Sequence, residues 1–144
     1  MIRGMESSGA GWAAADLDGL GEGPGIRKVR GAIGVTAFGI NTLVLAPFTH
    51  MRWHWHDEQQ EVYFVHRGSL TIEFDDGTVE VPAGSFVRVD AETPRRILNR
   101  GNDELVLVAI GGKDGYVGRD GNLRTDELEA IAGGAGFGFV PIVD

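Results

Sequence analysis

The chain has 144 residues, enough for one domain with one hydrophobic core and too few to favour two domains. Apolar residues make up 42% and charged residues 24%, a globular composition that excludes a disordered chain. The net charge of −8 argues against nucleic acid or an anionic membrane surface as a partner, and the absence of cysteine excludes disulfides and thiolate chemistry. The sequence contains no signal-peptide pattern and no apolar run long enough to span a membrane, so we expect a soluble, cytoplasmic protein.

Residues 1–25 are rich in glycine, alanine and serine, and they end in a glycine- and proline-rich run that interrupts any regular element. We therefore expect an N-terminal arm there. Between residues 26 and 112 short β-branched and apolar runs predict strands at 32–38, 41–46, 61–66, 69–74, 78–81, 85–89, 96–99 and 105–110. Turn residues separate the runs, and no helical pattern lies between them, so the pattern predicts an antiparallel sandwich or barrel.

Residues 113–144 form a C-terminal extension of different character. Thr125 can cap a short helix over 125–132, with acidic residues in its first turn and a pair of glycines after its end. The last apolar side chains, those of Phe137, Phe139, Val140 and Ile142, are too apolar for a solvated tail. We expect them to pack on the barrel or on a partner.

The four histidines lie close together, between His50 and His66. His54 and His56 are two residues apart, so on a strand both side chains leave from the same face. A polar turn follows, and Glu61 opens the next strand, from which it can return to the same interior. Two neutral imidazoles and one carboxylate with open positions form a ligand set that suits Fe(II) and also admits Mn, Ni, Co or Zn.

The segment around these residues resembles the first signature of the cupins. That signature is His-x-His, four residues, Glu, six residues, Gly, and His54, His56, Glu61 and Gly68 match it. The resemblance covers roughly residues 30–112. It implies an all-β fold of the cupin type, a double-stranded β-helix or jelly-roll barrel, here with an N-terminal arm and a short C-terminal helix.

The second cupin signature is Pro-x-Gly, two residues, His, three residues, Asn, and residues 90–99 resemble it in part. Pro94 and the closing Asn99 are present, but Arg95 stands where the family has its metal-binding histidine. The resemblance does not imply one activity, because cupins include dioxygenases, isomerases, epimerases, decarboxylases, storage proteins and sugar-sensing domains.

Arg95 leaves three interpretations open, since a guanidinium stays protonated and does not ligate a metal. In the first, His54, His56 and Glu61 hold a metal, and Arg95 binds the anionic group of a substrate with two hydrogen bonds. In the second, Arg95 pairs with Glu61 and its cation replaces the metal. In the third, Arg95 swings outward and His50 lies near the site.

The residues expected to line the pocket indicate its ligand. Tyr63 and Phe86 have inward parity, and with Arg95 and Asn99 they are the expected substrate-binding residues. An apolar pocket with imidazoles and a cation suits a small organic acid or phenolic compound. With Fe, Mn, Ni or Zn bound, we expect a dioxygenase-like oxidoreductase. Without metal, the alternatives are a binding or sensing protein, or an isomerase or epimerase with an imidazole base.

Trp53 and Trp55 alternate with the histidines and so leave from the outer face of the same strand. Two neighbouring tryptophans form an apolar patch that a soluble monomer rarely leaves bare. The N-terminal arm through Trp12 or the C-terminal segment at Phe137 and Phe139 can cover it. We favour a homodimer, with the arm or the tail contributing.

Overall fold

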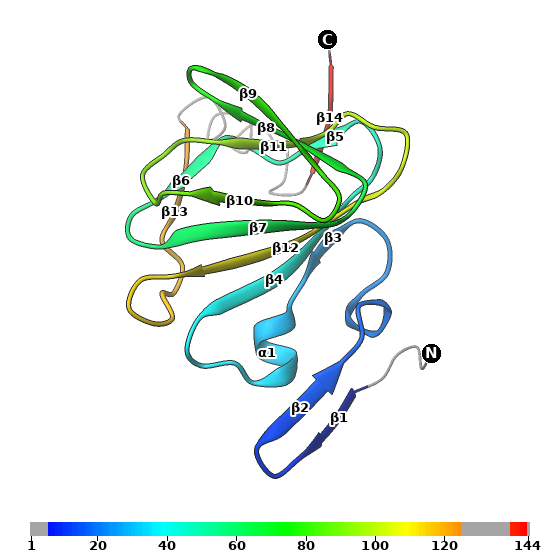
Figure 1. The fold of residues 1–144 in the computed structure, drawn as a ribbon, viewed down its shortest axis with the longest axis vertical. Helices are drawn as coiled ribbons and strands as arrows, with labels where there is room; N and C mark the ends of the chain where they lie inside the picture. The colour runs from blue at the N-terminus through cyan, green and yellow to red at the C-terminus, as the bar shows by residue number, and fades with distance from the viewer. Residues whose placement is uncertain (1–5, 125–138, 144) are drawn as a thin grey trace.

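The computed structural model describes residues 6–124 and 139–143 of the chain. Two five-stranded antiparallel sheets pack against each other (Figure 1). One sheet has the order β10-β7-β12-β4-β3, formed by Phe86–Val89, Gln60–Arg67, Leu105–Gly112, Gly39–Leu45 and Gly25–Arg27. The other has the order β14-β5-β11-β8-β9, formed by Val140–Pro141, Thr49–His50, Arg96–Asn99, Ser69–Phe74 and Gly77–Pro82.

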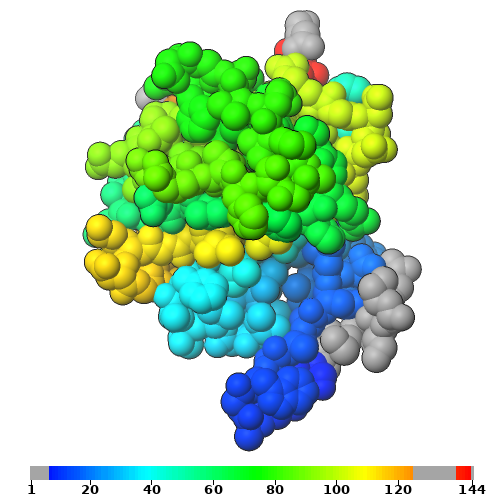
Figure 2. Space-filling model, viewed as in Figure 1, coloured from blue at the N-terminus to red at the C-terminus, as the bar shows by residue number. Residues whose placement is uncertain are grey.

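Two short strand pairs complete the set of strands. β6 (His54–His56) pairs with β13 (Gly121–Leu123) at one end of the barrel. β1 (Glu6–Gly9) pairs with β2 (Trp12–Ala15), and this hairpin projects from the body of the molecule (Figures 1 and 2). The expected all-β jelly-roll fold is confirmed.

The core lies between the two large sheets because alternate side chains of each strand point inward. In β7, Tyr63 and Val65 are buried, whereas His66 is exposed as expected. From the opposite sheet, Leu70 and Ile72 of β8 are fully buried against them. The strands expected between residues 41 and 110 are present as β4 and as β7 to β12.

The segment 32–38 differs from its expected strand. α1 (Val29–Ile33) occupies its first part, and Gly34 ends the helix with a φ of 72° while its N–H donates to the carbonyl of Arg30. β3 instead takes the sheet edge beside β4, so no partner is left there for a strand over 32–38. The single glycine within this apolar run, Gly34, weakens a strand there, because glycine in a strand interior has no side chain to pack.

The expected arm over residues 1–25 has defined structure where it is described. After β2, a 3-10 turn (Asp18–Leu20) leads to β3. The buried Arg27 fastens this segment by donating from Nη1 to the carbonyl of Leu17, at 3.0 Å, and from Nη2 to that of Gly23, at 3.1 Å.

The C-terminal residues return to the barrel. Phe139 packs against the core, β14 pairs with β5, and the N–H of Ile142 donates to the carbonyl of Phe48 at 2.9 Å. The helix expected over 125–132 and the residue Phe137 lie outside the described residues. Within the described part of the chain, no helix is long and apolar enough to cross a membrane.

Candidate functional site

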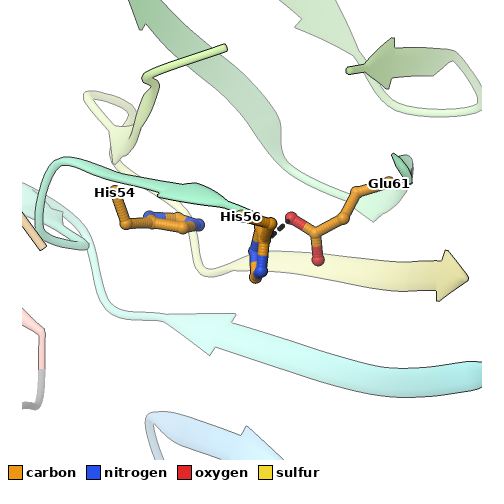
Figure 3. Close-up of side chains that lie close together, drawn as sticks. All are labelled: His54, His56 and Glu61. Atoms are coloured by element: carbon orange, nitrogen blue, oxygen red, sulfur yellow. Dashed lines mark ion pairs between the residues drawn. The ribbon is translucent and has the colours of Figure 1, made fainter. Parts of the chain in front are cut away.

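Three side chains converge at one end of the barrel, and they are the three that the sequence pattern predicts together. His54 and His56 come from β6 and Glu61 from β7, and one ligand atom of each lies within 4.8 Å of the others (Figure 3). Reciprocal backbone hydrogen bonds of 3.0 Å join His54 to Arg95 and fix β6 against the residue that precedes β11. All three residues are half-buried.

His54 presents one ring nitrogen to the pocket. Its Nδ1 lies 3.0 Å from the carbonyl oxygen of Arg52, an acceptor, so we assign the ring proton to Nδ1 and a lone pair to Nε2. Burial, together with the charge of Arg95, lowers the pKa of His54. The imidazole is therefore neutral, the form that ligates metals or accepts a proton.

His56 lies between two carboxylates. Its Nδ1 is 2.8 Å from Oδ1 of Asp120. Its Nε2 is 3.1 Å from Oε1 of Glu61, the contact drawn as a dashed line in Figure 3. Burial lowers the pKa of His56, but the hydrogen bonds and charges of the two carboxylates outweigh it, so the pKa is raised. Because Nε2 and a carboxylate oxygen are both lone-pair donors, the short approach requires a proton or a metal ion at Nε2.

Asp120 is the residue of this site that sequence reasoning missed. Its carboxylate accepts hydrogen bonds from the backbone N–H of Glu58 and from both the backbone and side-chain amides of Gln59, besides contacting His56. These bonds outweigh burial and hold the pKa of Asp120 well below its usual range. The contact joins residues 64 positions apart across β6 and β13, and no local pattern signals it.

Arg95 is fully buried and points inward, as strand alternation predicts. Its Nη2 donates to Oε1 of Glu61 at 2.6 Å, and its Nε donates to the hydroxyl of Tyr63 at 3.3 Å. Its Nη1 donates to the carbonyls of Thr93, at 2.8 Å, and Ala91, at 3.2 Å. Every nitrogen of the guanidinium is engaged within the protein. The two-bond contact with a substrate anion expected in the first interpretation is therefore not open to Arg95, and the third interpretation is excluded.

Glu61 accepts hydrogen bonds from several donors at one oxygen. The hydroxyl of Tyr63 donates to Oε1 at 2.6 Å, alongside Nη2 of Arg95. Burial raises the pKa of Glu61, but His56, Arg95 and Tyr63 together lower it to about 2. Burial raises the pKa of Tyr63, so its hydroxyl keeps the proton that it donates.

Two expected substrate-binding residues lie away from the pocket. Phe86 is 69% exposed on the outer face of β10, where its ring packs on that of Phe64, because the inward positions of this strand are Val87 and Val89. Asn99 is buried, but its amide donates to the carbonyls of Leu45 and Asp103 and closes the turn after β11.

The outer tryptophans are half-buried within one chain. The ring of Trp53 lies under the guanidinium groups of Arg96 and Arg124, at 5.6 and 4.6 Å from its centre, and β13 pairs along β6. Trp12 is 56% exposed. The chain itself covers much of the Trp53 patch, so these residues give no argument for a dimer.

His54, His56 and Glu61 line a cavity of about 490 Å³, which is in the size range of small-molecule sites. Its polar floor consists of His54, His56 and Glu61, with Tyr63 beside them. Its walls come from β3, α1, β4, β11, β12 and the segments before β6, β7 and β13. They include Ile26, Arg30, Ile40, Asn41, Leu43, Met51, Gln59, Ile97, Ala109, Tyr116, Val117, Arg119 and Asp120.

Known proteins resemble the chain in sequence pattern and in fold. The family model for the cupin domain matches residues 41–111. A cupin protein from Bacteroides fragilis aligns with a TM-score of 0.58 and 18% identity over 68% of this chain and 82% of its own. A sugar phosphate isomerase of the cupin superfamily from Silicibacter pomeroyi aligns with a TM-score of 0.58 and 24% identity over 67% of this chain and 64% of its own.

A protein from Thermus thermophilus aligns with a TM-score of 0.60 and 14% identity over 72% of this chain and 98% of its own. No curated protein matches the sequence. At these identities the structural likeness shows the fold.

Proposed function

The chain belongs to the cupin superfamily, with its cupin domain at residues 41–111, and on that basis we propose that its pocket holds a divalent transition-metal ion and binds a small organic anion next to it. His54 and His56 would hold the ion through Nε2, and Glu61 through its carboxylate. One observation carries this proposal. Both imidazoles are fixed through Nδ1, one by the carbonyl of Arg52 and the other by the carboxylate of Asp120, so each keeps Nε2 for an ion in the His54, His56 and Glu61 cluster. Metal-binding histidines are commonly oriented in this way.

The charges around the site support an anionic ligand. Glu61 and Asp120 are negative because both pKa values are lowered, and Arg95 is the buried cation beside them. With a divalent ion present, the floor of the pocket has a net positive charge, which attracts an anion in a poorly solvated cavity.

A bound ion with open positions would polarise the ligand and, for Fe(II), support a dioxygenase-like oxidation. The proposed candidates are Fe, Mn, Ni and Zn. The residues of this chain contribute the rest: Tyr63 and Arg95 hold Glu61, Asp120 holds His56, and the apolar side chains of the walls would pack against the apolar part of the ligand.

Elemental analysis of protein purified without chelator tests the proposal. We expect near-stoichiometric transition metal in the parent protein and little in His54→Ala. His66→Ala is the matched control, because His66 is exposed on β7 and should leave the metal content unchanged. Metal-free protein with no affinity for added Fe, Mn, Ni or Zn would contradict the proposal.

A second candidate, a metal-free binding or sensing pocket, is favoured by the pairing of Arg95 with Glu61. In that form His56 carries the proton at Nε2, so two cations balance the two carboxylates without a metal. The neutral His54 could then serve as the base of an isomerase or epimerase. For this candidate, Arg95→His should create metal affinity that the parent lacks. A parent that binds metal as tightly as Arg95→His would exclude it.

A further inference from the structure

We infer that the ligand of this pocket carries a second anionic group, which Arg30 and Arg119 bind at the mouth of the pocket. The inference rests on the proposed function, because it concerns the same ligand. It names the class of that ligand: a small organic acid with a short apolar body between two anionic ends.

The exposure of the lining residues orders them by depth. Tyr63 is 1% exposed and the side chain of Glu61 13% exposed, so they mark the floor. Tyr116 is 44% exposed, and Arg119 is also exposed, so they mark the mouth. The half-buried Arg30 lies with Tyr116. The pocket therefore has one polar group of residues at its floor and a cationic group at its mouth.

Arg30 is held in place but retains free donors. The Cζ atom of its guanidinium lies 4.0 Å from the centre of the Tyr116 ring, and its Nη1 donates to the carbonyl of Val35 at 3.3 Å. Stacking uses the flat face of a guanidinium and leaves its N–H edge open to a carboxylate. Among the described residues neither Arg30 nor Arg119 forms an ion pair, so both charges are available to a ligand.

The floor cannot bind this second group through Arg95. That guanidinium is fully buried and its nitrogens are engaged by Glu61, Tyr63 and backbone carbonyls. Other lining residues, such as Leu43 and Ala109, are apolar and suit an aliphatic ligand body rather than a charge. The pocket therefore suits a ligand with two separate anionic groups joined by an apolar body.

The inference is tested by comparing matched acids on the full-length protein loaded with Co²⁺. The probes are three dicarboxylates, succinate, glutarate and adipate, each paired with the monocarboxylate of equal length: butanoate, pentanoate and hexanoate. Isothermal titration calorimetry measures both affinities of each pair. We expect at least one dicarboxylate to bind about 10- to 100-fold more tightly than its partner, the range for hydrogen bonds between charged groups.

Two variants assign that preference to the arginines. Arg30→Gln and Arg119→Gln should each reduce the dicarboxylate preference, and together they should abolish it, while monocarboxylate affinity stays within about twofold. The matched control is Arg88→Gln, because Arg88 is exposed on β10 and pairs with Asp90 outside the pocket. It should keep the full preference.

The outcomes separate this inference from the proposed function. Co²⁺ binding without a dicarboxylate preference, a preference that survives in the double variant, or no binding by any of the six acids overturns the inference. Failure to bind Co²⁺ contradicts the proposed function instead. In that case the same six titrations without metal decide the inference.

Discussion

The buried guanidinium of Arg95 determines what the site can do. It lies at 2.6 Å from Glu61 and has no exposure to solvent. A buried ion pair gains little over apolar residues of the same shape, but removal of one partner leaves the other charge buried and unpaired. The pair therefore fixes the position of Glu61 and makes each partner dependent on the other.

Arg95→Met is expected to lower the free energy of unfolding by about 3–5 kcal/mol, because it leaves Glu61 without its counterion. Combining it with Glu61→Gln should cost much less than the sum of the two single changes. Urea unfolding of the four proteins measures this coupling, and Arg88→Met on the exposed face of β10 is the control. Strictly additive effects would show that the pair is not coupled.

A second prediction concerns Asp120, which orients His56 through its Nδ1 atom. Asp120→Asn should lower metal affinity about 10- to 100-fold, the usual effect of losing an outer hydrogen-bond partner of a ligating histidine. Zn²⁺ titration measures the affinity, and circular dichroism verifies the fold. Asp57→Asn is the control, since Asp57 contacts only Asn122 among the side-chain hydrogen bonds found in the described residues. Unchanged affinity in Asp120→Asn would contradict the positioning role.

Strand parity explains which site residues can be predicted from the sequence. His54, His56 and Glu61 follow from local alternation and one turn, and the structure brings them together. For Phe86 local alternation predicts the wrong face, because the register of β10 is set by its pairing with β7. Asp120 depends on pairing between β6 and β13, which lie far apart in the sequence.

At the level of elements, two glycines in the turns between strands differ in how closely the chain packs on them. Gly68 lies between β7 and β8 with a φ of 82°, and a Cβ there would lie 2.7 Å from the carbonyl oxygen of Glu104. Gly84 precedes β10 with a φ of 84°, but a Cβ there would meet nothing within 4 Å. The two glycines thus share a backbone conformation and differ in packing.

This pair gives a matched prediction. Gly84→Ala should cost about 1–2 kcal/mol, the penalty of a left-handed conformation for a residue with a Cβ. Gly68→Ala should cost more, because its Cβ also meets the backbone of the loop before β12. Thermal or urea unfolding of both variants measures the difference. Equal costs would show that the barrel yields at Gly68 without penalty.

At this scale the sequence predicts most of the barrel. The strands from β7 to β12 are predictable because short alternating runs are bounded by turn residues. The segment 32–38 has a similar composition but forms α1 and a turn, because the place beside β4 goes to β3. Which segment forms the edge strand depends on the whole sheet, so it cannot be predicted from a short stretch of sequence.

On the scale of the whole molecule, the pocket extends beyond the cupin domain at residues 41–111. Arg30 precedes that domain, and Tyr116, Arg119 and Asp120 follow it, yet all of them line the same cavity. The hairpin β1–β2 projects at a distance from the barrel (Figure 2). The segment after residue 111 therefore lines the pocket, whereas the β1–β2 hairpin does not.

Two truncations test that difference. Removal of residues 1–16 should leave Zn²⁺ affinity within about twofold, because the hairpin supplies no residue of the pocket wall. Removal of residues 113–144 should lower the affinity at least about tenfold, because it takes away Asp120 and one wall. Circular dichroism confirms that each product is folded. Equal affinities in both products would contradict a contribution of residues 113–144 to the site.

The internal pairing of Arg95 with Glu61 also bears on how the proposed ion would enter the site. In many small metal sites ion binding and folding are coupled, because the unfolded chain rarely holds a preformed site. Here Glu61 has a counterion built into the polypeptide, and both imidazoles are already oriented. If the proposed ion binds, folding and loading would thus be separate events, and an ion could enter and leave a finished barrel. Which ion resides there would then be set by supply in the surroundings and by relative affinity, not by the order of synthesis.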